Sequence, residues 1–331
     1  MAYDGSLTFN TSIDGSGFQS GLSKLGGAAK TGLKVAGVAI GTVTAGLAAA
    51  GAASIKLGSD FEAGMSRVKA ISGATEEEFK ALNDQAKQLG ADTAFSASQA
   101  AEGMENLASA GFSVEEITAA MPGLLDLAAA SGEDLAASSE IAASAIRAFG
   151  LEADDAGHVA DVLAANANMT NAAVVDTGYA FKYVAPIAKS LGISMEETAA
   201  SIGILSNAGI KGEQAGTVLR GAMTRLVKPT EAAANAAEAL GVSFFDSSGT
   251  MKPLSTIIGD LQKSTANLSD EQKNAYLSTI FGTEALSGML ALIDAGPEQL
   301  TELTQAYETC DGAAADAAAT MQDNQIGRAH V

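Results

Sequence analysis

The sequence predicts an all-α protein, an elongated array of short capped helices and helical hairpins, on three observations. Apolar residues recur with helical spacing, as at Ile141, Ala145 and Phe149. Helix start and stop signals repeat along the chain. Aromatic residues make up only 5% of it and Trp is absent, so these helices must pack through small side chains. One short N-terminal strand and a small β-hairpin near 241–253 are the expected exceptions.

The start and stop signals are clearest in the stretch SAGFSVEE, residues 109–116. Gly111 suits the left-handed residue that closes a helix. Ser113 suits the N-cap of the next helix, and Glu116 completes a capping box with it. Phe112 and Ile117 have the spacing of a hydrophobic staple. The stretch therefore predicts a helix end followed at once by a helix start.

The same pattern recurs along the chain. Further capping signals lie at Thr75–Glu78, Ser96–Gln99, Ser194–Glu197 and Ser269–Gln272. Glycines precede the acidic turns at intervals of roughly 40 residues, which indicates helical-hairpin units. These are Gly73, Gly111, Gly150 and Gly192. The units share too little identity to form a true repeat.

Local composition divides the chain into six predicted segments. Alternation at Leu7, Phe9 and Ile13 predicts the strand, and aromatic and β-branched residues around DSSG predict the hairpin. Gly296-Pro297 breaks the last helical region. The segments are 1–25, strand and short helix; 26–58, Ala/Gly-rich apolar helix; 59–240, helical core; 241–295, hairpin plus helices completing the core; 296–324, start of a polar helical extension; and 325–331, the terminal segment.

The apolar run Val35–Ile55 contains no charged residue, and a membrane-spanning helix needs about 20 such residues. Ala and Gly add little insertion energy, however. Gly37, Gly41 and Ala45 form a small-xxx-small pattern that lets helices approach closely. Three interpretations stay open: a helix buried against other helices, conditional membrane contact, and a constitutive span.

Charge and cysteine content restrict the class of function. The formal net charge is −20, and such a surface repels phosphate backbones, so we expect no sequence-specific or general nucleic-acid binding as a direct activity. Cys310 is the single cysteine and cannot form an internal disulfide, which favours a reducing compartment.

Adjacent acidic residues are the first candidates for chemistry. The pairs are Glu115 with Glu116, Glu196 with Glu197, and Asp154 with Asp155. All fall in predicted first turns, where the helix dipole favours negative charge. Neighbouring residues on a helix point about 100° apart, so a pair does not converge on one metal ion. We therefore interpret these pairs as helix capping.

The remaining candidates are isolated. His158 and Asp161 lie three residues apart and could share one helix face, but a zinc site needs three or four ligands, and the second histidine is His330. Cys310 has no histidine near it in sequence. The Gly-rich stretch Gly209–Gly216 lacks the ending of a phosphate-binding loop, which leaves an inter-helix turn.

A small basic cluster consists of Arg220, Arg225 and Lys228. It lies at a predicted helix C-terminus, where the dipole favours cations. The sequence thus predicts no catalytic, cofactor-binding or metal-binding residue, and a protein that is not an enzyme.

Three stretches together resemble the core region of the tape measure proteins of long flexible-tailed phages and prophages. They are LGADTAFSASQAAEGMENLASAGFSVEEI (Leu89–Ile117), VAPIAKSLGISMEETAASIGILSNAGIKGEQAGTVLRGAMTRL (Val184–Leu226) and LGVSFFDSSGTMKPLSTIIGDLQ (Leu240–Gln262). The opening Leu7–Leu25 also resembles the N-termini of that family, so the resemblance covers roughly residues 7–295.

The resemblance implies a structural role in the virion tail. Family members set tail length by templating tube polymerisation and are released at DNA ejection. The implied location is the tail lumen, with the host cytoplasm during assembly. The implied partners are the major tail tube protein, tail assembly chaperones, distal tail and baseplate proteins and further copies of the chain, with contact to the host membrane at ejection. The alternative from another class is a membrane-active or pore-forming helical protein that uses residues 35–55.

The last residues predict an artefact. IGRAHV, residues 326–331, is what ATC GGA AGA GCA CAC GTC encodes, the body of a widely used sequencing adapter, and a CAG codon for Gln325 fits its leading AG. Family members commonly run many hundreds of residues. We therefore expect residues 325–331 to be an assembly artefact and the natural chain to continue past about Asn324. Amplification of the locus across Asn324 tests this expectation, and a genuine stop codon after Val331 would contradict it.

Overall fold

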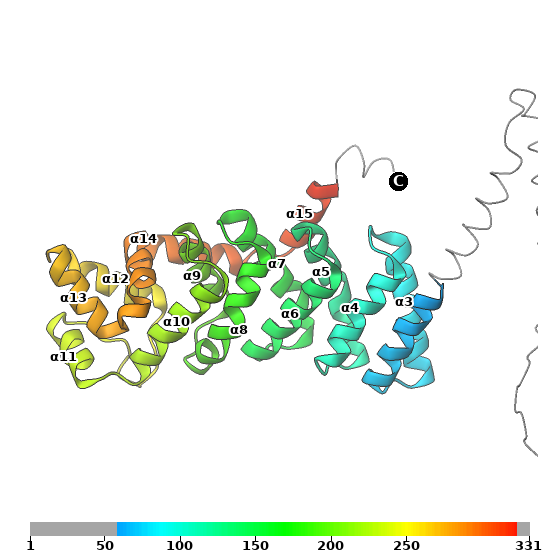
Figure 1. The fold of residues 1–331 in the computed structure, drawn as a ribbon, viewed down its shortest axis with the longest axis horizontal. Coiled ribbons are helices and arrows are strands. Elements are labelled where there is room, and N and C mark those ends of the chain that lie inside the picture. The colour runs from blue at the N-terminus through cyan, green and yellow to red at the C-terminus, as the bar shows by residue number, and fades with distance from the viewer. Residues whose placement is uncertain (1–57, 323–331) are drawn as a thin grey trace, which may run out of the picture. The chain divides into compact units, whose positions relative to one another are not determined.

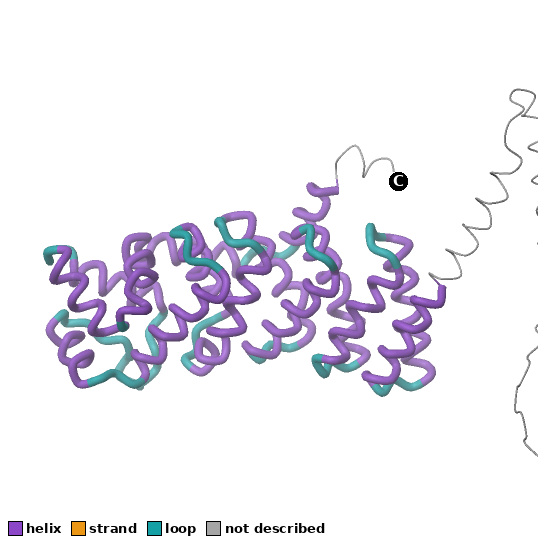
Figure 2. Tube along the Cα trace, viewed as in Figure 1, coloured by secondary structure: helices purple, strands orange, loops and turns teal. Residues whose placement is uncertain are grey.

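A computed structural model describes residues 58–322, which are mainly helical (Figures 1 and 2). They belong to one compact unit, Leu57–Val331. The predicted N-terminal strand, the apolar run Val35–Ile55 and residues 325–331 lie outside the described residues. Among those described, the all-α prediction is confirmed.

A helix over residues 58–72 opens the described region. The following elements are α3 (Glu76–Asp92), α4 (Ala97–Ser109), α5 (Val114–Ser131), α6 (Leu135–Phe149), the 3-10 turn η1 (Ala153–Asp155), α7 (Ala156–Met169), α8 (Val174–Ser190), α9 (Met195–Asn207), α10 (Gly212–Val227), α11 (Glu231–Ala239), α12 (Leu254–Thr265), α13 (Asp270–Phe281), α14 (Thr283–Glu308) and α15 (Ala313–Gln322).

The helices form two rows. In one row α4, α6, α8 and α10 pack side by side in that order, and in the other α5, α7 and α9 do the same, followed by α14. Each helical hairpin therefore adds one helix to each row, and the array in Figure 1 grows from α3 toward α11 and α13. In such an array each unit is stabilised mainly by its neighbours.

The predicted caps produce these short helices. Capping boxes form at Thr75, Ser96, Ser113 and Ser269. Asp134 and Thr230 cap α6 and α11 with their side chains. Each such cap satisfies backbone N–H groups that the helix itself leaves unpaired, and contributes about 1 kcal/mol.

Small residues let the helices approach closely. A methyl group at Gly216 of α10 would lie 2.4 Å from the carbonyl oxygen of Ala180 on α8. A methyl group at Gly123 of α5 would lie 2.9 Å from the Cα of Gly157 on α7. Both rows thus contain a position where backbones touch directly, as the alanine- and glycine-rich composition predicts.

The predicted β-hairpin near 241–253 is wrong. The described residues contain no strand, only one isolated antiparallel bridge between Phe245 and Met251. The tight turn itself forms, because the Asp246 carboxylate accepts the backbone N–H groups of Ser248 (2.8 Å) and Thr250 (3.0 Å). A ladder does not extend from it because α12 begins at Leu254, only three residues after the bridge. Aromatic residues here pack on helices instead.

Gly296 divides α14 into two helical parts. Its φ of 87° and ψ of 167° are non-helical, and Pro297 begins the second part. This second part and α15 then run back along the array, so that α14 contacts α7 and α15 contacts α5 and α7 (Figure 1). We call residues 297–322 the return segment.

None of the helices within residues 58–322 is by itself long and apolar enough to cross a membrane. Helices α13 and α14 meet the criteria of length and composition only as a pair, and that pair is bent by 118°.

Candidate functional site

The acidic pair of SAGFSVEE caps its own helix, as predicted. Ser113 accepts the backbone N–H of Glu116 at 3.2 Å, and the Glu116 carboxylate accepts the backbone N–H of Ser113. Arg147 of α6 completes this junction, because its guanidinium donates to the carbonyl oxygen of Gly111 at 2.7 Å and lies 4.4 Å from the ring centroid of Phe112. The stretch ends one helix, starts the next and joins both to the neighbouring hairpin.

Asp154 and Asp155 lie in η1 rather than in the first turn of an α-helix. The Asp155 carboxylate accepts the backbone N–H of Glu152 at 3.0 Å. Asp155 therefore stabilises the local turn.

The acidic pair of LGISMEE behaves differently. Ser194 accepts the backbone N–H of Glu197 at 3.1 Å, as predicted, but the reciprocal bond of the expected capping box does not form. The Glu197 carboxylate instead accepts the backbone N–H of Ser255 at 3.1 Å, and so caps α12, whose own N-cap residue, Pro253, offers no side-chain bond. Burial raises the pKa of Glu197, although backbone N–H groups of α12 oppose this.

Glu196 contacts His158, one of the two histidines of the chain. Its carboxylate lies 2.9 Å from Nε2 of His158, while Nδ1 of the same ring lies 3.3 Å from the Asp311 carboxylate. Burial lowers the pKa of His158, but the hydrogen bonds and charges of Glu196 and Asp311 outweigh burial and raise it. His158 therefore connects α7 to α9 and to the return segment.

Asp161 caps the return segment. Its two carboxylate oxygens accept the backbone N–H groups of Gly312 and Ala314, both at 2.8 Å, at the start of α15. Asp161 is only 9% exposed, so these bonds replace the hydration of its charge. Both members of the His158–Asp161 pair thus contact the return segment. No group of three metal ligands exists among residues 58–322, and His330 lies outside them.

Tyr307 anchors the same segment in the core. It is fully buried, and its hydroxyl donates to Oδ1 of Asn166 at 2.9 Å. The Asn166 amide in turn donates to the Thr177 hydroxyl at 2.8 Å. This chain of bonds links the return segment to α7 and α8, and it leaves the buried amide satisfied.

Cys310 lies between Tyr307 and α15, partly buried, and its thiol donates to the carbonyl oxygen of Tyr307 at 3.1 Å. Burial, together with the nearby carboxylates of Asp161, Asp311 and Glu196, raises the pKa of the Cys310 thiol to about 11. Because the thiolate is the nucleophile, this thiol is poorly suited to covalent catalysis near neutral pH.

The other sequence candidates stay apart from this junction. The Gly-rich stretch Gly209–Gly216 connects α9 to the first turn of α10, as predicted. Arg220 lies over the ring of Tyr183, 5.5 Å from its centroid. Arg225, in the last turn of α10, packs against Gly282.

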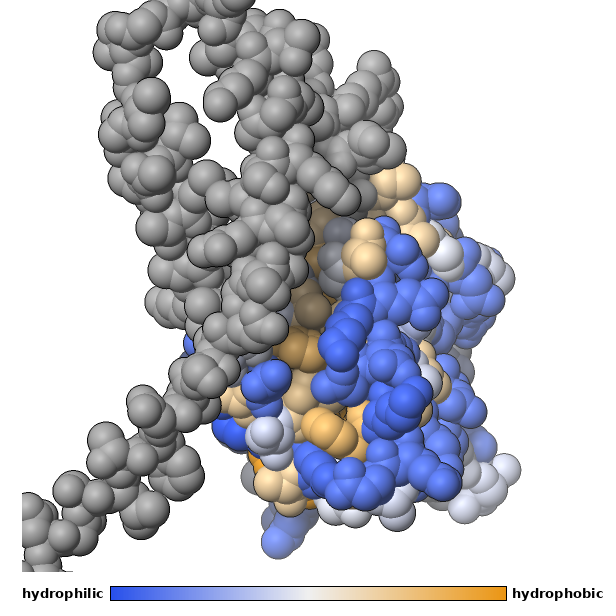
Figure 3. Space-filling view, turned by 90° about the vertical axis from the view of Figure 1, so that its right-hand side faces the viewer, coloured by the Kyte–Doolittle hydropathy of each residue, from blue (hydrophilic) through white to orange (hydrophobic). Residues whose placement is uncertain are grey.

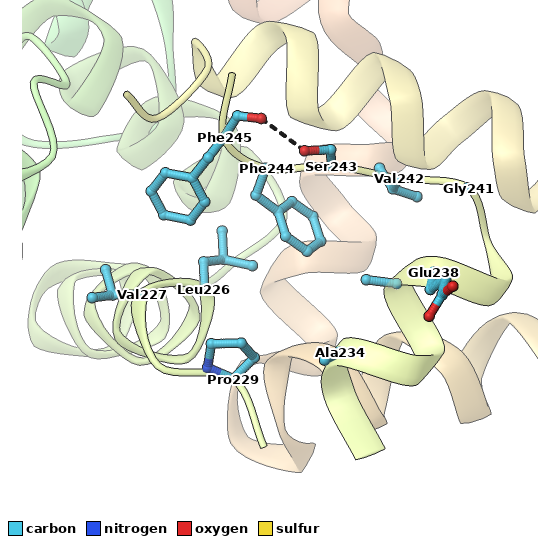
Figure 4. Close-up of a pocket in the computed structure, with 11 residues that line it drawn as sticks. Leu226, Val227, Pro229, Ala234, Glu238, Gly241, Val242, Ser243, Phe244 and Phe245 are labelled. Atoms are coloured by element: carbon cyan, nitrogen blue, oxygen red, sulfur yellow. Dashed lines mark hydrogen bonds between the residues drawn. The ribbon is translucent and has the colours of Figure 1, made fainter. Parts of the chain in front are cut away.

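A groove with a volume of about 620 Å³ lies between the end of α10, α11 and residues 241–245. Figure 4 shows Leu226, Pro229 and the rings of Phe244 and Phe245 around it. Glu238 is the one charged residue of its lining. A catalytic or small-molecule site needs several polar groups that converge on one point, and this groove has none.

Large apolar side chains are scattered over the surface of the described residues. The exposed ones are Ile71, Met169, Tyr179, Val227 and Met321. Figure 3 views the array from its α3 end, where hydrophilic residues cover most of the described surface in sight and apolar ones show between them. Single exposed apolar residues are normal for a protein surface.

Known proteins resemble the chain over most of its length. Residues 83–282 match the family described as phage-related minor tail proteins. A tape measure protein of Pneumococcus phage Dp-1 is 60% identical over 282 residues, which cover 85% of this chain and 24% of that protein. A probable tape measure protein of Escherichia phage P2 is 38% identical over 297 residues, which cover 87% of this chain and 36% of that protein. No solved structure matches the chain.

Proposed function

We propose that this chain is a structural part of a phage tail and helps to set tail length. The chain belongs to the tape measure proteins, within the family of phage-related minor tail proteins. The family match over residues 83–282 is the observation that carries this proposal. The chain spans about a quarter to a third of its two relatives, so the proposal concerns the part of such a protein that this chain represents.

The described residues support a role without catalysis. The carboxylates of Glu197 and Asp161 cap helices distant in the chain, and the groove beside Phe244 and Phe245 lacks convergent polar groups. Short helices in two narrow rows also suit a confined space such as the lumen of a tail tube. The net charge of −20 repels the phosphate backbone of DNA, which favours free passage of DNA through the same space.

Tail location implies particular partners and steps. In this proposal the tube protein polymerises around copies of the chain, assembly chaperones hold it beforehand in the host cytoplasm, and distal tail or baseplate proteins bind one end. The protein leaves the tube at DNA ejection. The alternative of a membrane-active protein rests on residues 35–55, which lie outside the described region, and the relatives favour the tail.

A change in chain length tests the proposal directly. In a phage that carries this gene, an in-frame deletion of residues 58–322 is expected to shorten the tails seen by electron microscopy. The loss is at most about 400 Å, from about 1.5 Å per residue if the segment is one extended helix in the tail, and much less if it stays a two-row array.

A tandem duplication of residues 58–322 supplies the converse test, and it is informative where the deletion stops assembly. It is expected to lengthen the tails. Tails of unchanged length in both variants would contradict a length-setting role. A duplication of the same codons with a stop codon before them serves as the matched control, and it should abolish tails of defined length.

A further inference from the structure

We propose that the return segment, residues 297–322, is a strap that opens as a unit by rotation at Gly296, while the two-row array beneath it stays folded. This inference rests on contacts within the chain and does not depend on the tail-length role. It concerns how the chain changes shape, which neither the family match nor the fold class addresses.

Gly296 is suited to act as the hinge. Its φ of 87° is strained for residues with a side chain, and glycine adopts it freely. The helix before it is held independently of the return segment, because Gln262 of α12 donates to the carbonyl oxygen of Ile293 at 2.9 Å and Lys273 of α13 pairs with Asp294 at 2.9 Å. Rotation at Gly296 therefore leaves the first part of α14 in place.

The return segment covers an apolar surface on α5 and a polar surface on α7. Three side chains of α7 bind it through hydrogen bonds: His158, Asp161 and Asn166. Other buried positions of the same helix, Val159 and Leu163, are apolar. On α7 a carboxylate, an imidazole and an amide regain hydrogen bonds from water when the covering segment leaves, so this part of the surface costs little free energy to expose.

The return segment itself buries little apolar surface at its far end. The buried residues of α15 are Ala314 and Ala318, each contributing one methyl group, and burial stabilises roughly in proportion to apolar area. Larger side chains, Leu300, Leu303 and Tyr307, lie in the part nearer the hinge. Segments with few buried apolar contacts open locally at lower free energy than the rest of a domain. The apolar burial of the segment is thus concentrated toward the hinge, where rotation displaces side chains the least.

Cys310 reports on this opening because it is the only cysteine of the chain and lies within the return segment. The experiment follows alkylation of Cys310 in the full chain under native conditions. Tyr307→Phe removes the hydroxyl bond to Asn166 and leaves the carboxylates around the thiol unchanged. We expect alkylation to become about five-fold faster, the effect of losing one net hydrogen bond on an opening equilibrium.

Thr75→Ala is the matched control. It removes one capping interaction at the start of α3, a helix outside both the return segment and α7, with a loss of stability of similar size. Local opening predicts that Thr75→Ala leaves the alkylation rate unchanged. Equal acceleration in both variants would mean that the thiol reacts only after global unfolding, and would overturn the proposal, as would no acceleration in Tyr307→Phe.

Hydrogen exchange gives a second readout that does not depend on the thiol. Amides of residues 310–316, including the two that Asp161 binds, are expected to exchange faster than those of α7 and of α14 before Gly296. Tyr307→Phe should accelerate exchange in residues 297–322 alone. Exchange of the return segment and α7 at one common rate would show that they open together, and would overturn the proposal.

Discussion

Replacement of Gly216 by alanine tests the close packing of α8 against α10. The added methyl group would lie 2.4 Å from the carbonyl oxygen and 2.9 Å from the Cα of Ala180. These are backbone atoms, so no side-chain rotation relieves the clash and one helix must move. Overpacking of this kind costs about 1–3 kcal/mol, and we take about 3 because the neighbour is rigid.

The gain in helix propensity works in the opposite direction. Alanine is favoured over glycine in a helix interior by about 1 kcal/mol, so Gly216→Ala is expected to lose about 2 kcal/mol of unfolding free energy in total. At Gly221, in the same helix, an added methyl group would meet no atom of a neighbouring element within 4 Å. Gly221→Ala should therefore gain up to about 1 kcal/mol, and the two variants should differ by about 3 kcal/mol.

Urea unfolding followed by far-ultraviolet circular dichroism measures this difference, with the slope of each transition checked for cooperative behaviour. Both substitutions replace glycine by alanine within α10, so the difference in stability between the two variants does not contain the change in helix propensity. If Gly216→Ala is as stable as Gly221→Ala, the backbones of α8 and α10 are not in contact at this position, and the packing of that row must be different.

Three further predictions concern single side chains. Burial raises the pKa of Glu197 above 4.5, so its carboxyl group binds a proton more tightly in the folded state than in the unfolded state. The wild type should therefore gain stability relative to Glu197→Gln as the pH falls from 7 toward 4.5. Urea titrations measure this difference in unfolding free energy, and a difference that stays constant with pH would contradict the prediction. The pKa of His158 is raised above 6.5, so the protonated ring contributes its full stabilisation of the folded state below pH 6.5. The difference in unfolding free energy between the wild type and His158→Gln should shrink as the pH rises above 6.5. Ser113→Ala should lose about 1 kcal/mol by thermal or urea unfolding, and an unchanged midpoint would refute the capping role.

Features set by neighbouring residues could be predicted from the sequence. A serine or threonine three residues before a glutamate or glutamine specifies a helix start through bonds inside one turn. Four of the five predicted boxes form in full, at Thr75, Ser96, Ser113 and Ser269. At 241–253 the local pattern predicts a hairpin that is wrong. The turn forms there, but α12 begins before strand pairing can extend beyond one bridge.

Contacts between distant parts of the chain could not be predicted in the same way. Asp161 and its partner Gly312 are separated by 151 positions, and nothing in the sequence near either residue indicates the other. The residues Gly296-Pro297 predict a break in the helix, but they do not indicate the direction in which the following helix runs. The sequence indicates the His158–Asp161 pair and Cys310 as separate candidates, and it does not indicate the return segment that contacts His158 and Asp161 and contains Cys310.

The two acidic pairs show why one motif has two outcomes. Glu116 accepts the backbone N–H of its own N-cap residue and so closes a box at an exposed turn. Glu197 faces the start of α12, which has proline at its N-cap and unpaired N–H groups, and the carboxylate binds there instead. The adjacent Glu196 then faces His158 across the α7–α9 contact. The motif thus specifies where a helix begins, whereas the exposed or buried surroundings of that turn decide whether its carboxylates serve the helix itself or join distant segments of the array.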